Sequence, residues 1–126
     1  MNFHKLTAVA VAALVATSAG TVFAASKTLD AVKLRGKIQC VVNPGLTGFA
    51  NPDDKGVWKG FDIDLCRAFA AAIFNDPKAA SFKPGTGKTR FTILRSGEAD
   101  VITRNSTWTF VRDVDLGFDF VGVNYY

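Results

Sequence analysis

The segment from Phe61 to Phe74 has the clearest helical pattern in the chain. Apolar side chains recur there at four-residue spacing on one face: Phe61, Leu65, Phe69 and Ile73, with Cys66 and Ala70 beside them. Asp62 and Asp64 fall in the first turn, where a negative charge is favourable to the helix dipole. The pattern predicts a helix with one apolar stripe, which another element must cover.

Short apolar segments on both sides of this helix are typical of buried strands. Lys37 to Val42 is rich in β-branched residues and stops at Asn43-Pro44-Gly45. Two more helices are predicted, at Lys27 to Arg35 and at Lys88 to Ser96, where Phe91 and Leu94 face inward. A turn is predicted at Asn51 to Gly56. Further strands are predicted at Ala80 to Lys83, Val101 to Thr103 and Phe118 to Phe120, and another strand begins at Val123 to Tyr126. Alternating strands and helices predict an α/β fold with right-handed crossovers and a mostly parallel sheet.

The first 24 residues have the pattern of a secretory signal peptide. His4 and Lys5 precede an apolar stretch from Leu6 to Ala16, and we expect cleavage after Ala24. A membrane anchor is the alternative, but the apolar stretch is shorter than the roughly 20 residues that a span needs. The predicted organisation is therefore a signal peptide at 1–24 and one small domain at 25–126.

The charge pattern and the histidine content exclude several functional classes. The full chain has a formal net charge of +4, and its positive residues are scattered singly, which argues against nucleic acid as a partner. His4 is the only histidine and would leave with the signal. Without an imidazole, most hydrolase mechanisms and zinc sites are disfavoured.

Two cysteines, Cys40 and Cys66, lie 26 positions apart, in a predicted strand and in the helix that follows it. Export to an oxidising compartment favours a disulfide between them. Two buried free thiols are the alternative at this point.

Two loops should lie beyond the carboxyl ends of the predicted strands, where open α/β sheets bind ligands. They are Asn43 to Phe49 and Arg104 to Arg112. The second loop has hydroxyl and amide side chains, a plausible helix N-cap at Thr109, and Arg112 in the turn that follows. Such a turn suits a carboxylate, because a guanidinium can bind both of its oxygens. The alternatives are a solvated charge and a surface pair of Arg112 with Asp113 or Asp115.

Two short motifs have plainer interpretations. Pro84-Gly85-Thr86-Gly87-Lys88-Thr89 is similar to the end of a phosphate-binding loop, but Phe82 occupies the position of the first glycine, so a strand-to-helix turn is expected. Asn105-Ser106-Thr107 matches the glycosylation acceptor pattern and equally provides hydrogen-bonding groups in a turn; the bacterial style of the signal favours the turn.

Several motifs, taken in order, resemble the periplasmic amino-acid-binding proteins of ABC importers. The resemblance covers Leu29 to Tyr126 and is nearest to the general L-amino-acid branch. The matching motifs are Phe61-Asp62-Ile63-Asp64-Leu65, Arg90-Phe91-x-x-Leu94-x-Ser96-Gly97-Glu98-x-Asp100-Val101, Thr107-Trp108-Thr109-x-x-Arg112, Leu116-Gly117-Phe118-Asp119-Phe120, and Asn43-Pro44-Gly45-x-x-Gly48-Phe49 with the pair Cys40 and Cys66.

The resemblance implies a site and a ligand. Arg112 falls at the arginine that binds the ligand α-carboxylate, and Asn105 and Thr107 fall where the family holds the carboxylate and the α-ammonium. Asn43 and Leu46 fall where side-chain-selecting residues occur. Branches for cationic ligands often have an acid and an aromatic at those two positions, so a neutral or broad range of L-amino acids is implied here.

The resemblance also implies a three-layer lobe with a mostly parallel sheet, periplasmic localisation and a membrane permease as partner. Family members have two lobes, so we expect 25–126 to correspond to part of the N-terminal lobe, with the second lobe absent. The implied role is binding without a chemical step. A truncated product without function, and an exported enzyme on the same scaffold, are the alternatives.

Overall fold

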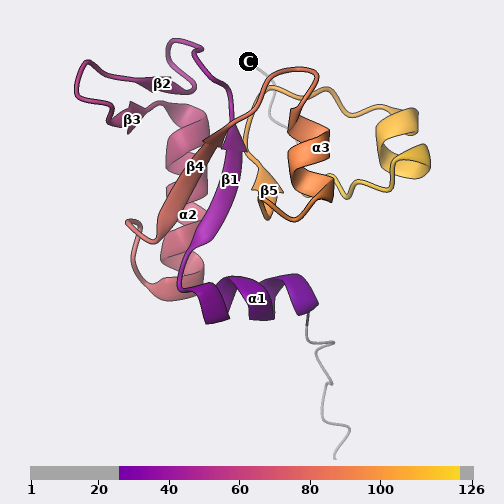
Figure 1. Ribbon diagram of the computed structural model, residues 1–126, viewed down its shortest axis with the longest axis horizontal. Helices are drawn as coiled ribbons and strands as arrows, with labels where there is room; N and C mark the ends of the chain where they lie inside the picture. Colours follow the sequence, from indigo (N-terminus) through magenta and orange to yellow (C-terminus); the bar gives the residue numbers. More distant parts are fainter. Residues whose placement is uncertain (1–25, 123–126) are drawn as a thin grey trace, which may run out of the picture.

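A three-stranded parallel sheet forms the centre of the molecule. The computed structural model describes residues 26–122. The strands β1 (Ile38–Val42), β4 (Ala80–Pro84) and β5 (Val101–Ile102) pair in the order β4-β1-β5 (Figure 1). All pairings in this sheet are parallel, with Ile38 opposite Ala80 and Cys40 opposite Val101. The predicted parallel sheet is confirmed, and the earliest strand of the chain is its central one.

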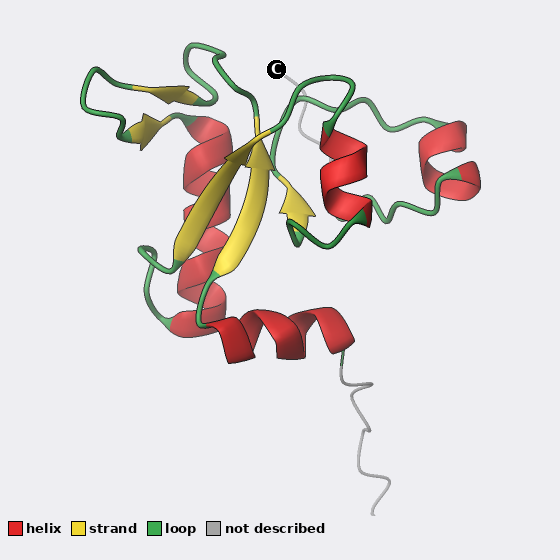
Figure 2. Cartoon of the chain, viewed as in Figure 1, coloured by secondary structure: helices red, strands yellow, loops and turns green. Residues whose placement is uncertain are grey.

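The helices lie close to their predicted positions (Figure 2). They are α1 (Lys27–Arg35), α2 (Phe61–Phe74), α3 (Arg90–Arg95) and a short π-helical turn, η1 (Val111–Asp115). The Ser26 hydroxyl caps α1 by accepting from the Leu29 N–H at 3.4 Å. The helix α3 is shorter than predicted, because Thr86 and Thr89 bond to each other in a turn before it begins. No helix of residues 26–122 is long and apolar enough to cross a membrane.

The helices cover both faces of the sheet, which gives three layers. On one face, Ile38, Cys40 and Val42 of β1 share a buried cluster with residues of α2. Adjacent strand residues point to opposite faces, and Val41 lies on the other face, beside Gly85 and near Ile93 of α3. Figure 1 shows β4 and β1 in front of α2, with α1 across one end of the sheet.

The buried face of α2 is rotated from the predicted stripe. Its fully buried apolar residues are Ile63, Cys66 and Ala70, whereas Phe61 is 48% exposed. The loop before the helix explains the difference. Gly48 O accepts from the Phe61 N–H at 3.0 Å, and the Phe61 ring meets the edge of the Phe49 ring. This loop fixes where the helix starts, and so places Ile63 rather than Phe61 over the sheet.

The predicted turn at 51–56 is confirmed, since the Gly56 N–H donates to the Asp53 carbonyl at 2.8 Å and the Asp53 carboxylate accepts main-chain N–H groups. The short strands β2 (Asn51–Pro52) and β3 (Trp58–Lys59), which pair around this turn in a small hairpin, were not predicted. The predicted strand at Phe118–Phe120 is wrong, because this segment has no ladder partner among the described residues. Aromatic stacking holds it instead, with Phe118 on Phe91. The predicted signal at 1–24 and the strand at 123–126 lie outside the described residues.

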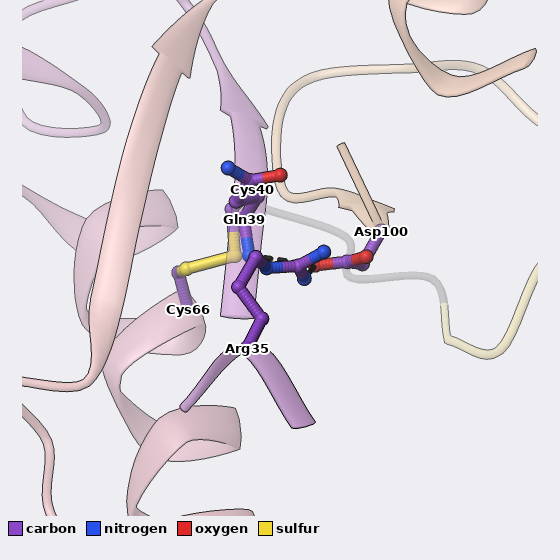
Figure 3. Close-up of a disulfide and its surroundings, with 5 residues drawn as sticks. All are labelled: Arg35, Gln39, Cys40, Cys66 and Asp100. Carbon is purple, nitrogen blue, oxygen red and sulfur yellow. Dashed lines mark hydrogen bonds and ion pairs between the residues drawn. A yellow bond between two sulfur atoms is a disulfide. The ribbon is translucent and has the colours of Figure 1, made fainter. Parts of the chain in front are cut away.

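The disulfide Cys40–Cys66 joins β1 to α2 (Figure 3). Both residues are fully buried, and their Cα atoms are 6.2 Å apart, within the range that a disulfide spans. The predicted disulfide is confirmed, and the alternative of two free thiols is not found. The bond fixes α2 on the face of the sheet to which Cys40 points.

The Asp100 carboxylate fastens the start of β5 to β1. It accepts from the Gln39 N–H at 2.8 Å and from the Arg35 guanidinium, and the Asp100 N–H donates to the Gln39 carbonyl at 2.8 Å (Figure 3). The Asp100 side chain is only 10% exposed. Removing its charge therefore weakens the partly buried hydrogen bond from the Gln39 N–H and the exposed ion pair with Arg35.

We expect Asp100→Asn to lower the free energy of unfolding by about 2 kcal/mol, because hydrogen bonds to a charged group are stronger than neutral ones. Urea unfolding followed by circular dichroism measures this loss. Asp64→Asn is the control, because Asp64 also pairs with an arginine, Arg67, but its side chain is 70% exposed. Its expected loss is less than about 0.5 kcal/mol; equal losses in both variants would contradict the role of Asp100.

Candidate functional site

The candidate site lies in the loops that follow the carboxyl ends of the three parallel strands. Asn43 follows β1, Gly85 follows β4, and Arg104 and Asn105 follow β5. Parallel strands end at the same edge of a sheet, so residues distant in sequence meet there. The two loops that the sequence indicated, after β1 and β5, are in direct contact through Asn43 and Asn105.

Asn105 is the residue at which these loops meet. Its side-chain Oδ1 accepts from Asn43 Nδ2 at 3.1 Å and from Arg104 Nη2 at 3.1 Å. Its main-chain carbonyl accepts from Arg90 Nη1 at 3.1 Å. Asn43 is fixed in turn, because its Oδ1 accepts from the Gly45 N–H at 3.1 Å. Both lone-pair positions of Asn105 Oδ1 are therefore in use, and the amide nitrogen is the group suited to a ligand acceptor.

Arg104 crosses the end of the sheet from β5 to β4. Its guanidinium donates to the Gly85 carbonyl as well as to Asn105. A side chain at Gly85 would collide with Val41 and press on the Arg90 main chain, so glycine is required where the loop, the strand and α3 approach this closely. Burial lowers the pKa of Arg104, and the nearby Asp62 carboxylate acts in the opposite direction.

Asp62 is buried at the start of α2, with 5% of its surface exposed. Its Oδ2 has no hydrogen-bond partner among the described residues. Burial raises the pKa of this carboxyl, and the positive charge of Arg104 opposes the rise. Asp64, two residues further along the helix, pairs with Arg67 instead.

Arg112 lies in the turn that opens η1. The N-cap of η1 is Phe110 rather than the predicted Thr109. The Thr109 hydroxyl still accepts from the Arg112 N–H at 3.4 Å, and Arg112 Nη1 donates to the Thr107 carbonyl at 2.5 Å. The guanidinium carbon lies 5.2 Å from the centre of the Phe91 ring. Among the described residues, Arg112 forms an ion pair with neither of its alternative partners, Asp113 and Asp115. Asp113 instead accepts from Trp108 Nε1 at 2.9 Å.

The three arginines Arg90, Arg104 and Arg112 make this end of the sheet strongly positive. Burial lowers the pKa of Arg90, and the charges of Arg104 and Arg112 lower it further. The ion pairs of the described residues involve other cations: Arg35, Lys59, Arg67 and Lys83. The donors Arg90 Nε and Arg104 Nε are buried and have no hydrogen-bond partner in the described part of the chain. The arrangement suits an anion, since its positive charges have no bonded carboxylate in residues 26–122.

The sequence analysis indicated Arg112, Asn105 and Asn43 but missed Arg90 and Arg104 as parts of the site. Arg104 is the second residue after β5, and Arg90 is the first residue of α3. Both positions face the carboxyl edge of a parallel sheet, which is the signal that would have found them. Leu46 lies in the loop after β1, where its main chain pairs with Ala50. Its role, like the ligand contacts of Arg112, Asn105 and Thr107, remains a prediction.

The turn at Pro84–Thr89 is a strand-to-helix connection, as its sequence predicts. Thr86 Oγ1 accepts from the Lys88 and Thr89 N–H groups, and Thr89 Oγ1 accepts from the Thr86 N–H at 3.0 Å. These N–H groups are therefore satisfied within the turn, whereas a phosphate-binding loop leaves them for its ligand. Within residues 26–122, no group of three or more His, Cys, Asp or Glu residues could hold a metal ion.

The three-layer parallel sheet, with arginines over the carboxyl ends of its strands, is a lobe of the α/β class whose ligand-binding edge is positively charged. Residues 38–121 match the model of bacterial extracellular solute-binding proteins, family 3. The chain belongs to this family.

Three similar proteins place the chain more narrowly within the family. It is 58% identical over 118 residues to the glutamate/glutamine/aspartate/asparagine-binding protein BztA of Rhodobacter capsulatus, covering 94% of this chain and 33% of BztA. It is 50% identical over 123 residues to the general L-amino acid-binding periplasmic protein AapJ of Rhizobium johnstonii, covering 98% of this chain and 36% of AapJ.

The third is the solved structure of an ABC transporter/periplasmic binding protein from Brucella ovis with glutathione bound. It superimposes with a TM-score of 0.77 and 58% sequence identity, over 79% of this chain and 31% of that one. The chain thus spans about a third of the length of each of these proteins.

Proposed function

We propose that this chain forms the carboxylate-binding side of a periplasmic amino-acid-binding protein that serves an ABC importer. The observation that carries the proposal is the gathering of Arg90, Arg104 and Arg112 where the loops after the strands meet. The names of BztA and AapJ support amino acids as the ligand class. Export by the signal at 1–24 and delivery to a membrane permease are parts of the same proposal, and the function requires no chemical step.

In this proposal, Arg112 binds the ligand α-carboxylate. Its Nη1 is already directed by the Thr107 carbonyl, which leaves the other edge of the guanidinium for the two carboxylate oxygens. The Asn105 amide nitrogen and the exposed Thr107 hydroxyl lie in the same turn as further polar contacts. Asn43, held by Asn105, and Leu46 contact the ligand side chain and set its range.

The charge of the site determines which amino acids we expect to bind. Three guanidiniums repel a cationic side chain, whereas acidic and amide side chains are tolerated. The ligand range is therefore broad among neutral and acidic L-amino acids and excludes lysine and arginine. This charge pattern agrees with the absence of an acid at Asn43 and of an aromatic at Leu46.

Isothermal titration calorimetry of the purified chain with glutamate, glutamine, asparagine, leucine and lysine tests the proposal. We expect heat from the first four, and Arg112→Ala should weaken their binding by at least about tenfold, because a charge-assisted bidentate contact is lost. Arg112→Lys keeps the positive charge but cannot bind both carboxylate oxygens in the same way. Its affinity should therefore lie between those of the unchanged chain and Arg112→Ala.

Arg95→Ala is the matched control, because Arg95 is an exposed arginine in the last turn of α3. Its affinities should equal those of the unchanged chain. The proposal is wrong if no amino acid gives heat, or if Arg112→Ala and Arg95→Ala bind equally well.

A further inference from the structure

The ring of Phe91, in α3, has three partners that converge on it from different parts of the chain. Phe118 stacks on the ring, with centroids 5.0 Å apart and planes inclined by 25°. The guanidinium carbons of Arg90 and Arg112 lie 4.8 Å and 5.2 Å from the ring centroid. One aromatic side chain therefore connects α3 with the turn that carries Arg112.

The geometry of these contacts matters for ligand binding. A guanidinium that lies over an aromatic ring is attracted through its flat face, and the N–H groups at its edges stay available. A carboxylate partner would instead occupy those edges and neutralise the charge. Phe91 thus fixes an arginine in place without competing with an anionic ligand.

The second guanidinium makes this support necessary. Arg90 and Arg112 carry the same charge and share one ring, so they repel each other, and the charges of Arg104 and Arg112 lower the pKa of Arg90. The electron-rich face of an aromatic ring offsets part of such repulsion. Among the described residues, the Arg112 guanidinium has one further contact, the hydrogen bond from Nη1 to the Thr107 carbonyl.

We propose that Phe91 is a positioning residue of the carboxylate site, which holds the Arg112 guanidinium by its face and leaves its edge donors for the ligand. This inference rests on the function proposed above for Arg112. The ring acts through Arg112 and does not itself contact the carboxylate. Its effect is therefore specific to ligands that carry an α-carboxylate.

The first experiment needs no ligand. In the nuclear magnetic resonance spectrum of the chain, the Arg112 Nε–Hε signal, assigned by its loss in Arg112→Lys, should show a ring-current shift and restricted motion. Phe91→Leu should remove both, and Phe91→Trp should keep them, because indole also offers a π face. An unshifted, mobile signal in the unchanged chain, or the same shifted signal in Phe91→Leu, overturns the inference.

Two control variants separate positioning from general stability. Phe82→Leu removes a ring that lies under another guanidinium, with the Arg67 guanidinium carbon 5.5 Å from the ring centroid. This variant should alter the Arg67 signal only. Phe118→Leu removes the ring stacked on Phe91 and loosens the same region. In both variants the Arg112 signal should keep its shift; its loss in Phe118→Leu to the same extent as in Phe91→Leu would show a merely structural role.

The second experiment measures discrimination between L-glutamate and L-isoglutamine, in which an amide replaces only the α-carboxylate. The unchanged chain should prefer glutamate, and Phe91→Leu should reduce this preference about fivefold, as the loss of a cation–π contact predicts. Phe82→Leu and Phe118→Leu should keep the preference. An unchanged preference in Phe91→Leu refutes the role of Phe91 and leaves that of Arg112 intact. If the unchanged chain binds neither compound, the proposed function fails, and the spectra still decide whether Phe91 holds Arg112.

Discussion

Replacing both Cys40 and Cys66 by alanine is expected to lower the free energy of unfolding by about 3–4 kcal/mol, from the chain entropy of a loop of this length. The disulfide closes a segment of 26 positions that contains the loop after β1, the β2–β3 hairpin and the first turns of α2. Because both cysteines are fully buried, the alanines also leave a small packing defect.

Urea unfolding of the oxidised chain, the reduced chain and the double variant separates these two contributions. Reduction should reproduce most of the loss, since it opens the loop and keeps the sulfur atoms in the core. A reduced chain as stable as the oxidised one would show that the crosslink contributes little, and that any loss in the double variant comes from packing.

Gly60→Ala is expected to lower the free energy of unfolding by more than about 3 kcal/mol, because backbone strain and a steric clash act together. Gly60 precedes α2 with φ 123° and ψ 173°, a region that only glycine occupies readily. A Cβ atom there would lie closer than 3.0 Å to the carbonyl carbon and oxygen of Phe49. That carbonyl accepts from the Asp62 N–H at 3.0 Å, so the clash also disturbs the first turn of the helix.

Gly56→Ala is the control for this variant. Gly56 also has a positive φ, of 76°, but a Cβ atom there meets nothing within 4 Å. Gly56→Ala should therefore lower the free energy of unfolding only through backbone strain, by about 1–2 kcal/mol. Thermal and urea unfolding of both variants measure the difference, and equal losses would mean that the close approach of Phe49 to Gly60 is not maintained in solution.

Local patterns were sufficient to predict the principal elements of the fold. The helix Phe61–Phe74, the strands around Cys40 and Phe82 and the parallel crossovers follow from periodicity, turn residues and element order. The rotation of α2 could not be predicted, because it depends on the loop that bonds Phe61 to Gly48. The segment around Phe118 has the composition of a strand, but aromatic stacking on Phe91 determines its conformation.

For the candidate site, the sequence indicated the loops but not the way they connect. Arg112 stood out by its position in a capped turn and by family resemblance. Arg90 and Arg104 did not, because their importance arises from Asn105, which receives hydrogen bonds from both. Asn105 contacts Arg90, 15 positions away, and Asn43, 62 positions away, while Arg104 beside it donates to the Gly85 carbonyl 19 positions away. These contacts become visible only when the order of strands in the sheet is known.

The uneven attachment of the strands has a consequence for how ligand binding and folding are coupled. The disulfide and a five-residue ladder unite β1, β4 and α2, whereas β5 pairs with β1 through two residues. The turn that carries Arg112 follows this weaker strand, and the Arg112 and Arg90 guanidiniums repel each other. An anion that binds there relieves the repulsion and raises the local free energy of opening by mass action. The ligand would then act as a counter-ion that stabilises the turn after β5.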